Sequence, residues 1–419
     1  MTTTAVGHPD YVFTRLTEPG ILADPYPYYR QLRDRARVLM VPTTGLRLLA
    51  PASNFCFITG HAEAQQAMQQ QGYRYVQAPD GTVEFLTRLD RAYTEGLFSG
   101  DRAHHTRLRR SLTGYLTLPR VSLLRSKAEQ RCDAAVTALV ERARDGVAVD
   151  VFTELAMPIA ISTLCDFIGV PHADGAALQP VVRRLAGLTE PIVNEQGFAD
   201  ASDATDILMA YHEDLIADRR RSPRDDLVSA LVALEHEDED RRLSQGEIET
   251  QLWAMWFLGF ETVAGSIGNA LLQILDHPIQ AAALGGRRTD VDGLVSECLR
   301  REPPITMAGG TRVTDRPLRI RDVVVPEDTD VRILLGAANR DPEAFVAPDR
   351  FDPTRDTSAT LTFGHGIHRC VGVHLARMQL SVALPRIHAQ LPTLRLDRQP
   401  ARRHTFFWRT FDHLHMSLE

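Results

Sequence analysis

The sequence has few cysteines, no basic excess and no run of residues that reads as a linker. Five cysteines are scattered through 419 residues without a CxxC pair, which is typical of reduced thiols rather than of a disulfide framework. Acidic residues outnumber basic ones, 54 to 47, and the net charge of −7 argues against binding to nucleic acid through its phosphates. We therefore expect small molecules and proteins as partners.

Signals for a membrane or for export are also missing. The longest strongly apolar run, LWAMWFLGF, has nine residues, whereas a membrane span needs roughly 20. The first residues, MTTTAVGHPDYVF, lack the basic stretch and the apolar stretch of a secretory signal. These absences predict a cytoplasmic protein that does not interact with a membrane.

No repeat, low-complexity tract or Gly/Ser-rich linker divides the chain, so we expect a single domain over residues 1–419. Prolines introduce a predicted helix at 24–36, and apolar runs near both ends of residues 37–59 predict a small sheet. Apolar residues at three- and four-residue spacing predict a helical core at about 62–302.

The last part of the chain, about 303–419, combines strands with a glycine-rich cysteine loop. Residues 318–335 predict two strands joined by a Pro-Glu-Asp turn, and residues 394–418 predict another hairpin. The predicted fold class is therefore mainly α with a minor β part.

One long apolar helix is predicted from Ser244, which forms a capping box with Glu247, to the proline at 278. Its middle contains Glu261 and Thr262, and each polar group is costly in an apolar helix unless it has a partner. The Thr hydroxyl can also bend a helix by bonding a preceding carbonyl. By itself, the segment is more typical of an exposed Glu beside a Thr that bonds its own helix.

The segment FGHGIHRCVG surrounds Cys370 with glycines. Gly364 and Gly366 permit a tight loop, and Gly372 permits a flat, bulky group to approach the backbone. The cysteine precedes a predicted helix, whose N-terminus favours the thiolate that binds metal. Two alternatives remain. Cys370 could be a small buried residue of the core. It could also bind zinc together with His365, His368 and His374, although the spacing of these residues matches no known zinc motif.

FGHGIHRCVG resembles the FGxGxHxCxG signature of the cytochrome P450 haem-thiolate monooxygenases, and the match covers six fixed positions. The resemblance implies that Cys370 is the proximal ligand of a haem b iron, to which its thiolate donates electron density. It also implies that Phe363 shields the sulfur, that His368 contacts a haem propionate, and that Gly372 lies against the cofactor.

Further segments resemble this family in the expected order. Glu297 and Arg300 form an ExxR pair on one helix face, which alone would be worth only a few tenths of a kcal/mol. PDRF resembles the family's PxRF and makes Arg350 the third member of a network that braces the cysteine loop. The resemblance covers nearly the whole chain, from about residue 24 onward.

Three residues are expected to hold haem propionates in addition to His368. His105 and Arg109, four residues apart in HHTRLRRSL, resemble the family's HxxxR segment and share one helical face. Arg312, in GGTRVTD, matches a further propionate arginine. The alternative for this basic helix is a solvated face, which is the preferred interpretation for Arg107 and Arg110.

GFET resembles the family's segment that activates oxygen, so Glu261 and Thr262 are the predicted catalytic residues and supply protons through ordered water. Leu258 stands where the family usually has Ala or Gly, and this larger side chain is expected to narrow the space above the iron. The segment between Arg300 and Arg312 is also longer than in soluble relatives. The predicted substrate pocket comprises Ala254, Leu258, Met307, Ala308, Gly309 and Phe406.

These features predict a bacterial-type monooxygenase that oxidises a small organic substrate, in secondary metabolism, as a monomer. A separate ferredoxin and a ferredoxin reductase that uses NAD(P)H are expected to supply two electrons, because the chain shows no flavin or iron–sulfur segment. His365, Arg369 and the arginines of HHTRLRR would face the ferredoxin. The same motifs also fit ring coupling, desaturation or nitration. They fit a haem protein that only binds a ligand less well, because Glu261 and Thr262 are both present.

Overall fold

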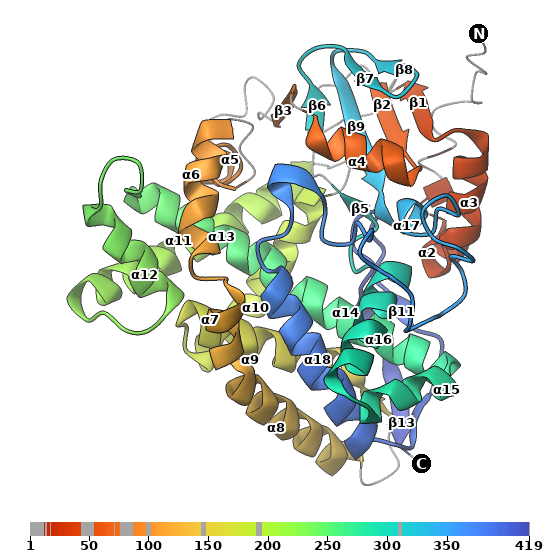
Figure 1. Cartoon of the computed structure of the whole chain (residues 1–419). Helices are drawn as coiled ribbons and strands as arrows, with labels where there is room; N and C mark the ends of the chain where they lie inside the picture. Colours follow the sequence, from red (N-terminus) through yellow and green to blue (C-terminus); the bar gives the residue numbers. More distant parts are fainter. Residues whose placement is uncertain are drawn as a thin grey trace.

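The computed structural model describes residues 12, 15–16, 18–42, 54–70, 72–75, 87–97, 102–143, 148–189, 195–308 and 312–418. Within them the fold is mainly α with a smaller β part, as the sequence predicts. Figure 1 shows the largest sheet at one end of the molecule, at the top of the view, and mostly helices elsewhere.

Helices make up most of the described residues. In the first half they are α2 (Pro19–Ala23), α3 (Tyr26–Arg35), α4 (His61–Gln69), α5 (Thr87–Thr94), α6 (Arg102–Thr113), α7 (Leu118–Leu123), α8 (Arg125–Ala143), η1 (Phe152–Ala156), α9 (Met157–Ile168), α10 (His172–Arg184), η2 (Leu185–Thr189) and α11 (Glu195–Arg221). In the second half they are α12 (Leu227–Ala233), η3 (Leu234–His236), α13 (Gln245–Gly259), α14 (Glu261–Asp276), α15 (Pro278–Ala281), η4 (Ala282–Gly285), α16 (Arg288–Arg301), α17 (Leu335–Ala338), η5 (Gly366–His368) and α18 (Val373–Gln390).

The strands are short and lie mostly at the two ends of the chain. They are β1 (Val38–Pro42), β2 (Asn54–Ile58), β3 (Tyr73–Tyr75), β4 (Val149–Asp150), β5 (Met307–Ala308), β6 (Arg312–Thr314), β7 (Leu318–Ile320), β8 (Val323–Val325), β9 (Thr329–Leu334), β10 (Leu394–Leu396), β11 (Ala401–Arg402), β12 (Phe411–His413) and β13 (His415–Leu418). Two of them, β3 and β4, lie within the predicted helical core at about 62–302.

The largest sheet joins the two ends of the chain. Its order is β1-β2-β9-β6-β3, with β5 also paired to β9. The predicted N-terminal strands are confirmed as β1 and β2, but β2 runs parallel to β9, with Cys56 opposite Val331. Every residue of β9 is buried, which accounts for its position inside the sheet rather than in a local hairpin.

Both predicted C-terminal hairpins differ in detail. In the first, β7 pairs with β8 around Arg321, whose φ is +49°, and the Pro-Glu-Asp segment instead leads to β9 in the other sheet. In the second, β11 pairs with β12, while β10 pairs with β13 and β13 also pairs with β4. The end of the chain is thereby fixed to its middle.

The predicted long helix is present but divided. Its capping box of Ser244 and Glu247 is confirmed, and it ends just before Pro278. At Phe260, with φ of −119°, α13 ends and α14 begins. The Thr262 hydroxyl donates to the Leu258 carbonyl at 2.8 Å across this break, which is the bond expected to bend such a helix.

Residues Gln245–Asp276 are long and apolar enough to cross a membrane by length and composition, but 72% of their most apolar window is buried inside the fold. The hydropathy of this segment reflects its place in the core. A Cβ on Gly259 would lie 3.0 Å from Leu164 Cδ1, so the segment also packs closely against α9.

Candidate active site

The cysteine loop is closed by its own backbone. The Cys370 N–H donates to the Phe363 carbonyl at 2.8 Å. Gly364 and Gly366 have φ values of +72° and +74°, in the left-handed region that favours glycine. A Cβ on Gly366 would lie 2.9 Å from the Met68 carbonyl oxygen, so a side chain there would displace the backbone of α4. The expectation of a tight, glycine-dependent loop is confirmed.

Cys370 has accessible surface, whereas the other four cysteines are buried. Protein atoms nevertheless surround its sulfur closely, and this burial raises the pKa of the thiol, opposed by the Gly372 N–H, Arg109 and Arg369. An accessible side chain surrounded by protein lines a space inside the fold rather than the outer surface. Because burial prevails, the sulfur becomes a thiolate when a metal cation shares its charge.

A group of basic residues, which we call the basic cluster, lies beside this loop and comprises His105, Arg109, Arg312 and His368. The ring centroids of His105 and His368 are 4.2 Å apart. Burial, together with Arg312, His105 and Arg109, lowers the pKa of His368 to about 3. Burial and Arg109 lower the pKa of His105 to about 4. The charged neighbours that shift these two pKa values are all basic residues.

Two buried nitrogens of the cluster, His105 Nδ1 and Arg312 Nε, have no hydrogen-bond partner among the described residues. An unsatisfied buried polar atom costs roughly 1–3 kcal/mol. An anionic ligand would satisfy both nitrogens and offset the repulsion within the cluster. The cluster therefore fits the two carboxylates of the haem that the sequence resemblance implies, and Cys370 fits its iron.

Around the junction of α13 and α14, one stripe of residues has accessible surface. Met255, Leu258, Gly259 and Thr262 are partly accessible, while their neighbours in the chain are buried. These positions have the spacing of one helical face. We call them the accessible stripe. Its apolar side chains and one hydroxyl offer a surface for a small organic molecule.

Glu261 does not belong to the accessible stripe. Its side chain is buried, and Oε1 accepts hydrogen bonds from Arg403 Nη1 at 2.5 Å and Thr410 Oγ1 at 3.3 Å. Arg183 Nε of α10 lies 3.6 Å from the same oxygen. The acid predicted to supply protons is therefore held by the C-terminal segment and by α10, and Thr262 faces another way.

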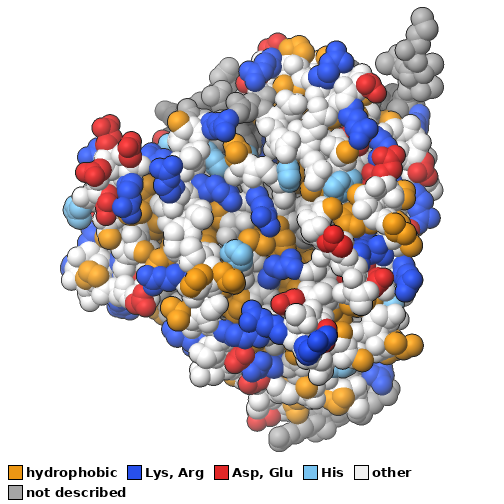
Figure 2. Space-filling view, viewed as in Figure 1, with side chains coloured by type: hydrophobic (Ala, Val, Ile, Leu, Met, Phe, Trp, Pro, Cys, Tyr) orange, Lys and Arg blue, Asp and Glu red, His pale blue; other side chains and the backbone are white. Residues whose placement is uncertain are grey.

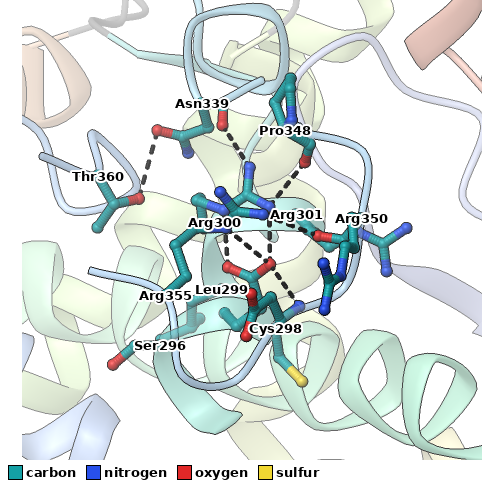
Figure 3. A network of polar contacts seen from close by, with 12 residues as sticks. Ser296, Cys298, Leu299, Arg300, Arg301, Asn339, Pro348, Arg350, Arg355 and Thr360 are labelled. Atoms are coloured by element: carbon teal, nitrogen blue, oxygen red, sulfur yellow. Dashed lines mark hydrogen bonds and ion pairs between the residues drawn. The ribbon is translucent and has the colours of Figure 1, made fainter. Parts of the chain in front are cut away.

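The predicted bracing network exists with one different member. Glu297 and Arg300 are fully buried, and Arg300 Nε lies 2.7 Å from Glu297 Oε2. Arg355 completes the network, with its Nε 3.4 Å from Glu297 Oε1. Figure 3 shows Arg300 and Arg355 within this network of polar contacts. The prediction for Arg350 is wrong, because its side chain is exposed and only its carbonyl meets Arg355.

The bracing network also reaches the loops before the cysteine. Arg300 donates to the carbonyl oxygens of Asn339 and Pro348, both at 2.7 Å. Asn339 in turn bonds the Leu361 N–H at 2.8 Å. Glu297 thus fixes, through Arg300 and Asn339, the approach to the cysteine loop.

The predicted substrate pocket is only partly accessible. Leu258 and Ala308 have accessible surface, whereas Ala254 and Met307 are 2% and 1% exposed and pack in the core. On α13, Met255 takes the place expected for Ala254, because Ala254 lies on the buried flank of the stripe. Gly309 lies outside the described residues.

Phe406 is buried and lines a small cavity that opens to solvent. Thr306, Tyr29 and Trp408 line the same cavity, which lies between the N-terminal helices and the C-terminal segment. Neither Cys370 nor Thr262 borders this cavity.

The zinc alternative is not supported by the geometry of the described residues. His365 Nε2 lies 2.8 Å from Gln69 Nε2, and His374 is exposed. These histidines and Cys370 do not form a group at metal-ligand distances.

Residues 291–391 match the Cytochrome P450 family. Over 415 residues the chain is 33% identical to Cytochrome P450 BJ-3 of Bradyrhizobium diazoefficiens, and the match covers 95% of this chain and 94% of that protein. The chain belongs to the cytochrome P450 family. The fold class and the haem b cofactor predicted from the cysteine loop are thereby confirmed, and the protein is a P450 monooxygenase.

Other bacterial P450s are similar over most of their length. Cytochrome P450 monooxygenase PikC of Streptomyces venezuelae is 33% identical, with 90% of this chain and 86% of that protein covered. 6-Deoxyerythronolide B hydroxylase of Saccharopolyspora erythraea is 30% identical, with 94% and 96% covered. The solved structure of P450BioI in complex with a hexadec-9Z-enoic acid ligated acyl carrier protein matches with a TM-score of 0.83, 26% identity and coverage of 95% and 99%.

Sequence reasoning missed several residues of this P450 site. Arg355 follows Arg350 by five residues, and spacing alone gave no reason to prefer it. Met255 could have been found from the three-residue step to Leu258 on one helix face. Arg403 and Arg183 gave no local signal, because their partner Glu261 is distant in sequence.

Proposed function

We propose that this P450 takes two electrons from a separate ferredoxin, through a reductase and NAD(P)H, and oxidises a small organic substrate of secondary metabolism. The observation that carries the proposal is the accessible stripe, where the Thr262 hydroxyl stands among apolar side chains of an otherwise buried helix. The 6-deoxyerythronolide B hydroxylase, which is named for the small molecule that it hydroxylates, and the monooxygenase PikC support the substrate class.

Haem, when bound, supplies the redox-active iron at which oxygen is activated. Cys370 would hold the iron through its sulfur, with the Phe363 side chain beside the loop and the Gly372 N–H donating to the sulfur. The basic cluster would hold the propionates. His105 Nδ1 and Arg312 Nε would then gain the partners that they lack in the protein alone.

Thr262 is the residue that we assign to positioning water. Its hydrogen is donated to the Leu258 carbonyl, so the lone pairs of its oxygen remain to accept a hydrogen bond from water in front of the stripe. Glu261 would supply protons from behind this position, held by Arg403 and Arg183. Apolar Leu258 and Met255 would limit the size of the substrate and exclude bulk water.

The ferredoxin would bind on the face that covers the cysteine loop. Figure 2 shows Lys and Arg side chains gathered across the middle of this face. Arg102, Arg110 and Arg369 are exposed there, and Arg109 and Arg369 are close enough to oppose the rise in the Cys370 pKa. Such a field attracts an acidic protein and raises its association rate. We further propose that the enzyme works in the cytoplasm as a monomer.

The absorption spectrum of the reduced carbon monoxide complex tests the ligand assignment. The wild type should show the strongly red-shifted Soret band of a thiolate ligand, and Cys370→Ala should lose it. Cys298→Ala is the matched control, because Cys298 is buried in α16 and should leave the band unchanged. A red-shifted band in Cys370→Ala would refute the assignment.

Electron transfer can be tested with a surrogate ferredoxin and reductase. NAD(P)H oxidation should require the ferredoxin, and Arg110→Glu should slow reduction of the haem iron most strongly at low salt. Arg398→Glu is the control, since Arg398 is equally exposed but lies near the C-terminal strands. Equal rates in both variants would contradict the proposed docking face.

A further inference from the structure

A second group of side chains that could bind a metal ion lies far from the large sheet. It consists of Asp150 in β4, His413 at the end of β12 and His415 at the start of β13, near the C-terminus in Figure 1. One ligand atom of each lies within 4.8 Å of the others, and no other group of this kind occurs among the described residues. None of the three belongs to the haem site described above.

The strands place these side chains on one face. β13 pairs antiparallel with β4, and His415 is directly opposite Asp150. Directly paired residues point to the same side of a sheet, and His413, two residues earlier, shares the side of His415. The two imidazoles are stacked, with centroids 5.5 Å apart and planes inclined by 24°. Their nitrogens therefore converge on one carboxylate.

The Asp150 carboxylate is oriented by the backbone before any ion arrives. Oδ1 accepts from the N–H groups of Phe152 at 3.1 Å and Leu414 at 2.9 Å. Oδ2 lies 2.8 Å from His413 Nδ1 and so faces the histidines. This is the arrangement of a ligand whose second oxygen is fixed by neighbouring hydrogen bonds.

One nitrogen of the group lacks a hydrogen-bond partner, and one side of the group is open to solvent. His415 Nδ1 is buried and has no hydrogen-bond partner among the described residues. Asp150 is 7% exposed and His413 58% exposed in their side chains, so an ion can enter from solvent and keep a water ligand. The carboxylate of Glu154, which accepts from the Asp150 N–H at 3.2 Å, adds negative charge nearby.

We propose that Asp150, His413 and His415 bind one Zn²⁺, with water as the fourth ligand. Two imidazole nitrogens and one carboxylate oxygen are a donor set that suits zinc, whereas Mg²⁺ and Ca²⁺ prefer oxygen ligands throughout. The ion would join β4 to the C-terminal strands. Phe411 of β12 packs on Gly268 of α14, where a Cβ would lie 2.6 Å from its ring, so zinc would also strengthen that contact.

The zinc content of the haem-loaded enzyme tests the proposal. After equilibration with zinc and removal of loosely bound metal, the wild type should keep about one zinc per haem iron, counted by elemental mass spectrometry. The double variant His413→Gln/His415→Gln should lose it, with binding at least about tenfold weaker. His388→Gln, an exposed histidine of α18, should keep the wild-type ratio. The same zinc-to-iron ratio in wild type and double variant would overturn the site.

A second experiment uses the unaltered protein, so its result does not depend on whether a variant folds. Diethyl pyrocarbonate modifies accessible imidazoles, and peptide mass spectrometry can follow its reaction with His413 and His415. Zinc should protect both residues and leave His388 as reactive as before. Equal modification of His413 with and without zinc would exclude the ion from this position.

Discussion

The Glu261 carboxylate lies 2.5 Å from Arg403 Nη1, so the acid of the central helix is tied to the C-terminal segment. The next residue, Thr262, belongs instead to the accessible stripe. These two residues are adjacent in the sequence, but their side chains lie in different parts of the protein. If Glu261 passes a proton toward Thr262, its carboxylate must first take up that proton and then release it. Two arginines stabilise the negative charge of this carboxylate.

The first prediction concerns this pair. Glu261→Gln and Arg403→Gln should each lower turnover roughly tenfold, equivalent to about 1.4 kcal/mol of barrier. The double variant should be little worse than either single variant, because the two residues act as one unit. His404→Gln, an exposed neighbour, is the control. Losses that simply multiply in the double variant would show that Arg403 does not act through Glu261.

The second prediction separates Arg355 from Arg350. Arg355→Ala removes a partner of the fully buried Glu297 carboxylate and should cost about 1–3 kcal/mol of unfolding free energy, with partial loss of haem. Arg350→Ala removes an exposed side chain and should change stability by no more than about 0.5 kcal/mol. Thermal midpoints and haem content measure both effects. The reverse order would restore Arg350 as the bracing residue.

The contrast between these two arginines shows which features can be predicted from the sequence and which cannot. The cysteine loop was predictable because glycine angles, a thiol and a helix start are local features of FGHGIHRCVG. The capping box at Ser244 was predictable for the same reason. The third bracing residue was not, because the exposed turn at Arg350 and the buried approach of Arg355 are decided by loops that fold around Glu297.

Contacts between residues that are far apart in the sequence also limited the prediction of the sheet and of the site. Nothing local to β2 indicates that it pairs with β9, some 270 residues later, and the hairpin signal around the Pro-Glu-Asp turn even favoured a different partner. Glu261 has a strong local context but takes its partners from α10 and the C-terminal segment. Sequence patterns predicted which residues matter better than they predicted what those residues contact.

The third prediction tests the accessible stripe. Leu258 has accessible surface and is larger than the residue that the family usually has at this position. Leu258→Ala should therefore admit bulkier azole inhibitors, seen as tighter binding of the larger members of a size series in spectral titrations. Leu258→Met, which nearly conserves volume, should keep the wild-type order. An unchanged order of affinities in Leu258→Ala would place this side chain away from the haem.

The fourth prediction concerns pH and a histidine outside the active site. Burial lowers the pKa of His212 in α11 to about 3, and neither ring nitrogen has a partner among the described residues. An unfolded histidine titrates near about 6.5, so below that pH the unfolded state binds a proton that the folded state does not. Stability should fall as the pH drops from about 6.5 toward 3.

His212→Leu should remove this contribution. Between about pH 7.5 and pH 5.5 the wild type should lose roughly 1.4 kcal/mol more unfolding free energy than the variant. Denaturant unfolding at the two pH values measures the difference, and the exposed His388→Leu serves as the control. The same pH dependence in wild type and His212→Leu would mean that His212 gains its proton in the folded protein.

The last prediction tests the role of Thr262. Its hydroxyl donates to the Leu258 carbonyl at 2.8 Å and leaves lone pairs for a water in front of the accessible stripe. Thr262→Ala removes that acceptor but few substrate contacts, so substrate affinity should stay nearly unchanged. The electrons should instead reduce dioxygen to hydrogen peroxide, and product per NAD(P)H should fall by about an order of magnitude, equivalent to about 1.4 kcal/mol.

Two further variants show whether the hydroxyl itself is responsible. Ser266 lies one turn later on α14, and its hydroxyl makes the same kind of bond, to the Thr262 carbonyl at 2.8 Å, but the residue is buried. Ser266→Ala should therefore keep the wild-type coupling, and Thr262→Ser should restore most of it. Product, peroxide and NAD(P)H are measured together, with a substrate found by its effect on the ferric haem spectrum. If Thr262→Ala couples as well as the wild type, the protons for oxygen activation reach the haem by a route that does not pass this hydroxyl.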